Sequence, residues 1–246
     1  MNFSKIRHDS KNMTMLSFDL DVHNPKSFLH YFLKTYLQST YDSLSKSNVT
    51  LSGKTILDIG IGRGRALSIF KKLKVKKVIG IDINSKETIY AKEKANELNL
   101  ALEIILDKND NSYLNSIEDE SYEIISIMYT LFCLPSDTIR ENIINQVKRI
   151  LKPKGFLILM DSQKYSMISY LNGIINTRKF VTKEEMLSNF KPLKLISWEE
   201  CDYFYFFNKP MDFIGQIFGS KIYKLLDNLS RKIKLPGSMI IAIFKK

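Results

Sequence analysis

The sequence contains few of the residues that mark secreted, fibrous or disordered proteins. Only two of its 246 residues are Cys, Cys133 and Cys201, which excludes a disulfide framework and favours a reducing compartment. Six Pro and ten Gly are too few for a collagen-like or low-complexity chain. The three His residues all lie before residue 31, and no His, Cys and Asp cluster has metal-ligand spacing. We therefore expect a globular protein without a metal site.

Long apolar runs are also lacking. The longest, Phe156–Met160 and Met239–Phe244, have the length of strands, far below the roughly 20 residues of a membrane-spanning helix. Residues 1–5 are followed by polar residues, whereas a signal peptide would have an apolar core there. We therefore expect a cytoplasmic protein with no transmembrane segment.

Charge of one sign is in excess. Lys and Arg number 37 and Asp and Glu number 26, which gives a formal net charge of +11. Such a balance suits acidic partners, but most of the basic residues are lysines scattered along predicted helices, as on a solvated surface. Residues 212–234 combine apolar and basic side chains, so a peripheral contact with an anionic membrane is one interpretation of this segment. A helix that covers the sheet or the substrate entrance is the interpretation that we favour.

From residue 55 onward, short apolar runs alternate with amphipathic segments. This alternation predicts an α/β fold, a Rossmann-like, mostly parallel sheet with helices on both faces. The predicted strands are Thr55–Ile59, Val78–Ile81, Glu103–Leu106, Glu123–Met128 and Phe156–Met160. The predicted helices between them are Arg65–Leu73, Ser85–Asn99 with Ser85 as its N-cap, and Pro135–Leu151.

The rhythm changes after residue 161. We predict a helix over Lys183–Phe190 capped by Thr182, a long strand over Leu195–Phe207, one helix over Asp212–Lys234 and a last strand over Ser238–Phe244. The two late strands bring the sheet to seven and favour an antiparallel hairpin at its edge. We expect residues 1–50, with a helix over Ser27–Leu44, to form an N-terminal helical cap, and 51–246 to form the main domain, with a substrate-side insertion at 162–236.

The most specific motif follows the first predicted strand. Asp58 precedes three glycines, Gly60, Gly62 and Gly64, whose missing side chains allow a ligand to approach the backbone. The spacing G-x-G-x-G differs from the G-x-G-x-x-G of dinucleotide sites, and a carboxylate at Asp58 suits an ammonium group better than a pyrophosphate. Asp82, at the end of the second strand, can accept both hydroxyls of a ribose. A nicotinamide dehydrogenase is the alternative that this spacing disfavours.

These residues resemble the class I S-adenosylmethionine-dependent methyltransferases. That family has an acidic-x-Gly-x-Gly-x-Gly motif, matched by Asp58 to Gly64, and an acidic residue that ends its second strand, matched by Asp82 before Ile83. Its Leu-Lys-Pro-x-Gly turn is matched by residues 151–155, and its Phe-Asp-x-Val motif is softened here to residues 122–125. The resemblance covers residues 52–161.

The resemblance implies S-adenosylmethionine as cofactor, with Asp58 toward its amino-acid end and Asp82 and Ile83 at its ribose. The family's acidic residue after the third strand, near the adenine, is matched here by Asp107 or by Asp110. We expect Tyr129, just past the fourth strand, to contact the methionine part. No catalytic base is identified. The weak candidates are Asp161, His30 and Tyr31.

The acceptor is less well defined by the sequence. Aromatic residues gather in the two predicted caps, at Tyr31, Phe32, Tyr36, Tyr203, Tyr205 and Phe213. They favour an enclosed site for a small molecule or a glycan, methylated at oxygen or nitrogen. The positive charge keeps an RNA methyltransferase as the alternative, and a non-catalytic cofactor-binding protein is a further one. The oligomeric state is not predicted.

Overall fold

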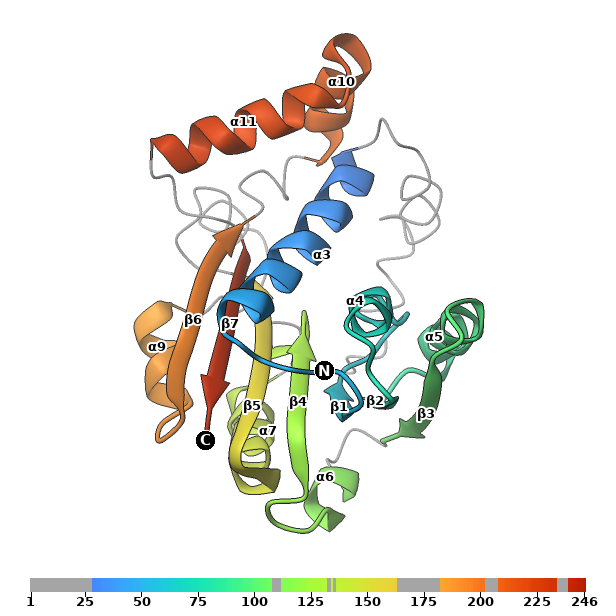
Figure 1. The fold of residues 1–246 in the computed structure, drawn as a ribbon, viewed down its shortest axis with the longest axis vertical. Coiled ribbons are helices and arrows are strands. Elements are labelled where there is room, and N and C mark those ends of the chain that lie inside the picture. The colour runs from blue at the N-terminus through green and yellow to red at the C-terminus, as the bar shows by residue number, and fades with distance from the viewer. Residues whose placement is uncertain are drawn as a thin grey trace.

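The chain folds around one mixed β-sheet (Figure 1). The structure is a computed structural model that describes residues 28–107, 112–131, 134, 136–162, 182–201, 208–233 and 239–246. The sheet has seven strands in the order β3-β2-β1-β4-β5-β7-β6. The strands are β1 (Thr55–Ile59), β2 (Lys77–Asp82), β3 (Ala101–Leu106), β4 (Tyr122–Met128), β5 (Leu151–Ser162), β6 (Lys194–Cys201) and β7 (Met239–Lys245). All neighbours are parallel except the pairs that β7 makes with β5 and β6, so the predicted antiparallel edge is confirmed.

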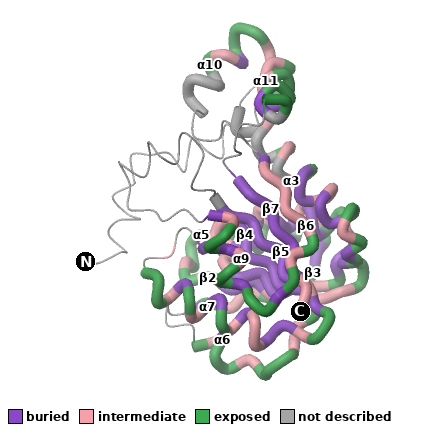
Figure 2. Tube along the Cα trace, turned by 90° about the vertical axis from the view of Figure 1, so that its left-hand side faces the viewer, coloured by how far each residue is buried: buried purple, intermediate pink, exposed green. Residues whose placement is uncertain are grey.

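Helices cover both faces of the sheet, as predicted. They are α3 (Phe28–Lys46), α4 (Leu67–Lys72), α5 (Ser85–Glu97), α6 (Ser112–Ser116), α7 (Asp137–Ile150), α9 (Lys183–Asn189), α10 (Asn208–Phe218) and α11 (Lys221–Lys232). Because side chains alternate along a strand, two separate cores form. Ile56 of β1 belongs to the core under α3, α4 and α5, whereas its neighbour Leu57 belongs to the core under α6, α7 and α9. Figure 2 shows the strands buried between these layers.

The order of the strands creates a switch point beside β1. After β1 the chain builds β2 and β3 on one side, then returns to place β4 on the other side of β1. The loops that leave β1 and β4 therefore diverge, and ligands of open α/β sheets bind in the crevice at such a point, outside the carboxyl ends of the strands. The glycine motif follows β1 at this edge.

Two details of the predicted helices were wrong. The N-cap of α5 is Asn84, whose side-chain oxygen accepts from the backbone N–H groups of Lys86 and Glu87, and not Ser85. The predicted helix over 212–234 is two helices, which separate at Gly219, where the backbone has a φ of 78°. A residue with that φ cannot continue a helix, and glycine adopts it without steric cost. Strand β6 ends at Cys201, and residues 202–207 of the predicted strand lie outside the described residues.

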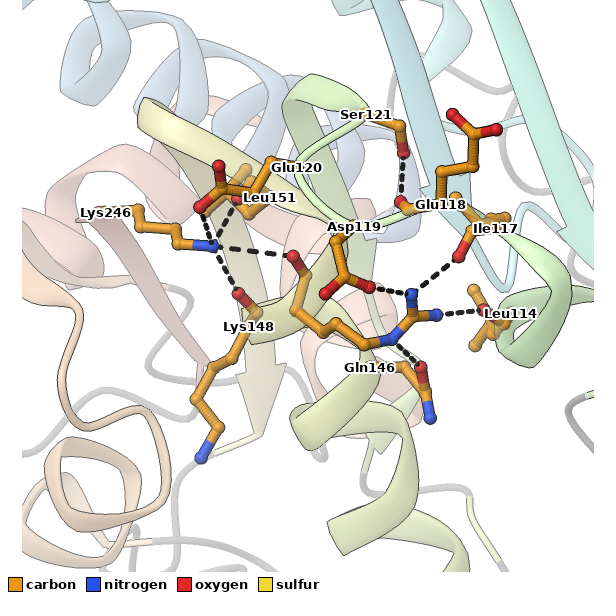
Figure 3. Close-up of polar contacts among 11 residues, drawn as sticks. Leu114, Ile117, Glu118, Asp119, Glu120, Ser121, Gln146, Lys148, Leu151 and Lys246 are labelled. Carbon is orange, nitrogen blue, oxygen red and sulfur yellow. Dashed lines mark hydrogen bonds and ion pairs between the residues drawn. The ribbon is translucent and has the colours of Figure 1, made fainter.

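At the other end of the strands from the glycine motif, two basic side chains, Arg149 of α7 and Lys246 after β7, bind backbone carbonyls (Figure 3). Arg149 donates to the carbonyl oxygens of Leu114 and Ile117, at 2.9 and 2.6 Å, and pairs with Asp119. Lys246 donates to the carbonyls of Lys148 and Leu151, at 3.0 and 2.7 Å. The last carbonyls of a helix have no partner within the helix, so these contacts satisfy the ends of α6 and α7.

Arg149→Gln is expected to lower the free energy of unfolding by about 2 kcal/mol, because it removes hydrogen bonds from a charged donor to two carbonyls. Urea unfolding measures the change. Lys148→Gln is the matched control, since its Nζ makes one exposed bond, to the carbonyl of Asn189, and it should cost about 0.5 kcal/mol or less. Equal losses in the two variants would contradict the assignment.

Candidate cofactor site at the carboxyl ends of β1, β2 and β4

The glycine loop leaves β1 with three residues in the left-handed region of φ. Gly60, Gly62 and Gly64 have φ values of 80°, 51° and 73°. The loop is fixed to the neighbouring strand because the N–H groups of Gly60 and Ile61 both donate to the carbonyl of Ile81, at 2.8 and 3.1 Å. Side chains other than glycine rarely adopt such backbone, so the sequence motif corresponds to a real conformational requirement.

The three glycines differ in what surrounds them. A Cβ on Gly60 would lie 2.1 Å from Oγ1 of Thr130, and one on Gly64 would lie 2.5 Å from a methyl group of Leu67. A Cβ on Gly62 would have as its nearest neighbour only the carbonyl of Gly60, 4.0 Å away. Gly60 and Gly64 are therefore glycines for packing, whereas Gly62 borders open space that a ligand can occupy.

Asp82 lies beside that open space. One carboxylate oxygen accepts from the N–H of Gly62 at 2.7 Å, and the other accepts from the N–H of Asn84 at 2.9 Å. Each oxygen of a carboxylate has two lone pairs, so each can accept one further hydrogen bond. Two hydroxyl groups on adjacent carbons, as in a ribose, match this arrangement. The residues present therefore fit a nucleoside placed against Gly62.

Asp58 lies deeper than its sequence position suggested. Its side chain is buried and accepts a hydrogen bond from the hydroxyl of Ser126, its register partner on β4. Burial raises its pKa from 3.8 to about 7; the Ser126 bond opposes the shift and the charge of Asp82 adds to it. Near neutral pH this carboxyl can hold or release a proton, so it can respond to a cationic group nearby.

The other predicted contacts follow β2, β3 and β4. Ile83 comes directly after Asp82 and is 50% exposed, an apolar surface beside the ribose acid. Asp107 is buried, and its backbone N–H donates to the carbonyl of Asp82 at 3.0 Å, which joins the ends of β2 and β3. Tyr129 follows β4 with a φ of 59°, and its N–H donates to the carbonyl of Met160. Asp110, the alternative to Asp107, lies outside the described residues.

Three residues that the sequence reasoning missed hold these loops. Thr130 donates through Oγ1 to the carbonyl of Ile59 at 3.1 Å, which ties the end of β4 to the end of β1. Arg63 donates to Glu87 of α5 at 2.7 Å, with both side chains largely buried, and its guanidinium lies over the ring of Tyr90. An Arg inside a glycine motif followed by a Glu in the first turn of a helix is a signal that could have predicted this pair.

The third is Arg140, on the first turns of α7. Its side chain is buried, Nε donates to the carbonyl of Leu131 at 3.2 Å, and it pairs with Asp137. It therefore fixes the chain just beyond Tyr129 and Thr130. A basic residue at the start of a helix opposes the helix dipole, and this bond to the preceding loop accounts for its position.

The candidate bases have mixed outcomes. Asp161 is buried near the carboxyl end of β5, whereas the hydroxyl of Tyr31 donates to Asp227 of α11 at 2.8 Å and so contributes to the packing of α3. The side chain of His30 lies outside the described residues. Of the predicted aromatic lining, Phe213 is exposed, and Tyr203 and Tyr205 lie outside the described residues, as do the side chains of Phe32 and Tyr36.

A surface depression of about 710 Å³ is unrelated to this site. Its lining includes Lys54, Tyr113, Glu123 and Lys152, at the amino ends of β1 and β4. The glycine loop lies at the carboxyl ends of these strands, on the opposite side of the sheet's length. Among the described residues no group of His, Cys, Asp and Glu side chains could hold a metal ion.

Comparison with known proteins agrees with this geometry. Residues 56–155 match the family model of a methyltransferase domain. The chain carries a methyltransferase domain over these residues. In this methyltransferase domain the matched range runs from β1 to the beginning of β5, so it includes the glycine loop, Asp82 and Tyr129. Residues 1–50 and 162–236, the expected cap and insertion, lie outside the match. A search of curated proteins gave no match.

Solved structures share the fold of the methyltransferase domain. A SAM-dependent methyltransferase from Archaeoglobus fulgidus is 18% identical, with 89% of this chain and 100% of that chain covered and a TM-score of 0.58. Geranyl diphosphate methyltransferase in complex with SAM is 14% identical, with 88% and 86% covered and a TM-score of 0.57. The cyclase SpnF is 16% identical, with 87% and 82% covered and a TM-score of 0.60. At these identities the likeness establishes the fold alone.

Asp58→Asn tests the buried carboxyl. The folded protein keeps this proton up to about pH 7, whereas the unfolded chain releases it near its ordinary pKa of 3.8. Because the folded state binds more protons in that window, wild-type stability falls as the pH rises through it and is level above it. The variant lacks this loss because Asn has no carboxyl to titrate. Its side-chain oxygen can still accept the Ser126 bond. Between about pH 5 and about pH 7 it should gain about 2 to 3 kcal/mol relative to wild type by urea unfolding.

Ser126→Ala provides the complementary measurement. Its hydroxyl lowers the pKa of Asp58, so without it the fall in stability should extend to higher pH than in wild type. Parallel pH profiles for wild type and Asp58→Asn would show that the carboxyl does not titrate in this range.

Proposed function

We propose that this methyltransferase transfers a methyl group to an oxygen or nitrogen atom of a small molecule or a glycan. When bound, S-adenosylmethionine supplies an activated methyl group on a sulfonium. The observation that carries the cofactor part of this proposal is the open space at Gly62 beside Asp82, whose two carboxylate oxygens accept from backbone N–H groups and can each accept one hydroxyl more.

The roles of the neighbouring residues follow from their positions. Asp82 accepts the hydroxyls of the ribose, and Ile83 offers an apolar surface to the flat adenine. Asp107 lies at the end of β3, where it can accept from an amino group of the base. Asp58 and Tyr129 lie toward the methionine part, and ionised Asp58 favours the ammonium group there. Because the methyl group is already activated, the remaining task of the protein is to align the acceptor and exclude water.

The caps support an enclosed acceptor site. Figure 1 shows α10 and α11 at the end of the molecule toward which β4 and β6 point, and α3 running from beside β6 and β7 up to this hairpin. Tyr31 of α3 bonds to Asp227 of α11, so residues from both caps meet there. A cap over this edge favours acceptors of limited size over a long nucleic acid. RNA is the second candidate, favoured only by the net charge of +11.

Gly62→Ala separates cofactor binding from folding. The added methyl group has space in the protein, so the variant should lose only about 1 kcal/mol of stability, from a left-handed φ without glycine. It should bind S-adenosylhomocysteine about tenfold more weakly, because the methyl group enters the space assigned to the ligand. Isothermal titration calorimetry measures the affinity.

Gly53→Ala is the matched control. Gly53 has a φ of 72° and equally open surroundings, but it precedes β1 at the other edge of the sheet. It should show the same loss of stability with unchanged affinity. Wild-type affinity in Gly62→Ala, or tight binding of NAD in place of S-adenosylhomocysteine, would refute the placement of the cofactor.

A panel of acceptors tests the reaction. Wild type incubated with S-adenosylmethionine should release S-adenosylhomocysteine with at least one member of a panel of amines, phenols and hydroxylated sugars, and Gly62→Ala should be slower with the same acceptor. RNA should give no release of S-adenosylhomocysteine. It should also show no binding with a steep salt dependence, which is the signature of contacts to several phosphates. Methylation of RNA with a steep salt dependence would instead assign the second candidate.

A further inference from the structure

Part of the outward, exposed surface of the α10–α11 hairpin is apolar. We define this outer face by six residues: Phe213, Ile217, Phe218, Leu225, Leu229 and Ile233. Their exposed fractions run from 51% to 68%. Figures 1 and 2 place the hairpin at one end of the molecule, beyond the strands. Single exposed apolar residues are ordinary, but six on one short hairpin need a physical explanation.

The inner face of the hairpin is already packed without these residues. Tyr223 is buried and its ring lies 5.3 Å from that of Tyr31 of α3. A Cβ on Gly215 would lie 1.7 Å from the hydroxyl of Tyr223, so α10 and α11 approach closely because residue 215 is glycine. Asp227 is buried and accepts from Tyr31. The outer face is therefore not what holds the hairpin to the protein.

Helical spacing makes the outer face continuous along α11. Leu225, Leu229 and Ile233 recur every four residues, so they form a stripe on one side. Three exposed lysines of the same helix, Lys221, Lys224 and Lys232, lie along one side of this stripe. The acidic residue of α11 is the buried Asp227. The exposed charge of this helix is thus positive, and it borders an apolar stripe.

We propose that the outer face of the α10–α11 hairpin docks on an anionic membrane surface. The apolar side chains would enter the boundary between head groups and acyl chains, and the lysines would contact lipid phosphates, as in interfacial amphipathic helices. In the described part of the chain no helix has the length and apolar character to cross a bilayer. The contact is therefore a peripheral one. It would bring the carboxyl edge of the sheet, with the cofactor site, toward the membrane (Figure 1).

Charge selects this occupant over a second copy of the chain. In a symmetric dimer the same patch meets itself, so the lysines beside the stripe would be brought to the same interface as the lysines of the other copy. Like charges brought together at an interface oppose association. Lipid phosphates instead provide the opposite charge next to an apolar phase, which is the combination that the hairpin presents.

Vesicle flotation of the full chain tests the proposal. Wild type should float with phosphatidylcholine vesicles in which about a third of the lipid is phosphatidylglycerol, and not with phosphatidylcholine alone. Lys221→Gln with Lys224→Gln should weaken binding about twentyfold, since each lysine near an anionic surface contributes about fivefold. Phe218→Ser should weaken it about tenfold, through lost burial of an apolar side chain.

Matched controls lie on exposed residues far from the hairpin. Lys76→Gln with Lys92→Gln removes the same charge from the opposite part of the chain, and Ile89→Ser removes an apolar side chain of comparable exposure. Both should bind vesicles within about twofold of wild type. Affinity for S-adenosylhomocysteine, measured in parallel, should be unchanged in Phe218→Ser. This readout separates a failure of docking from a failure of the proposed function.

Three results would overturn the proposal. The first is equal binding to neutral and anionic vesicles, and the second is the same loss in the control lysine pair as in the hairpin pair. The third is absence of vesicle binding by wild type; a dimer in sedimentation that Phe218→Ser dissociates would then assign the outer face to a second copy.

Discussion

The carboxyl ends of β1 and β4 can lie against each other only because residue 60 has no side chain. Thr130 fills the volume that a Cβ on Gly60 would need, and its hydroxyl bonds to the carbonyl of Ile59. Two residues before Gly60, the buried Asp58 is hydrogen-bonded to Ser126 and so joins the same two strands. The chain switches sides of the sheet between these strands, so their close packing determines where the crevice opens. Gly62 and Asp82 lie at the mouth of that crevice, and the contacts between β1 and β4 determine their positions.

Burial of Asp58 illustrates how such a site is constrained. A carboxyl whose pKa is raised to about 7 makes the folded state less stable at neutral pH than a neutral isostere would. A side chain selected for stability alone would be apolar here, as its neighbours Leu57 and Ile59 are. The cost becomes intelligible where the carboxylate can meet a cationic group, which is the role that we propose for it. A strongly shifted pKa of this kind is typical of functional sites, where a residue serves binding at a cost in stability.

Much of the fold could be predicted because buried parallel strands leave a strong local pattern. Runs such as residues 55–59 and 123–128 are short and almost wholly apolar, and they lie between amphipathic segments. This pattern indicates buried strands and not helices. The glycines and acidic residues of the site could be predicted because they are requirements of the backbone and of charge. Contacts between distant positions could not, and Thr130, Arg140 and the Arg63–Glu87 pair belong to this class. Local competition explains the smaller errors, since Asn84 and Ser85 are both good caps and only the backbone decides between them.

The segment at 208–233 shows the limit of the periodic pattern most clearly. Its amphipathic period is visible in the sequence, and the usual inference is that the apolar side faces the protein. In α11 the inward side combines apolar Ile222, Tyr223 and Leu226 with the buried Asp227 and Ser230. Leu225 and Leu229 lie outward. Periodicity reports that a helix has two unlike faces, but not which one the rest of the chain covers. That choice depends on Gly215, which admits the ring of Tyr223, and on Tyr31, which satisfies Asp227. With those polar groups bonded inside, the apolar stripe is left at the surface, and the exposed lysines beside it determine which kind of surface it can meet.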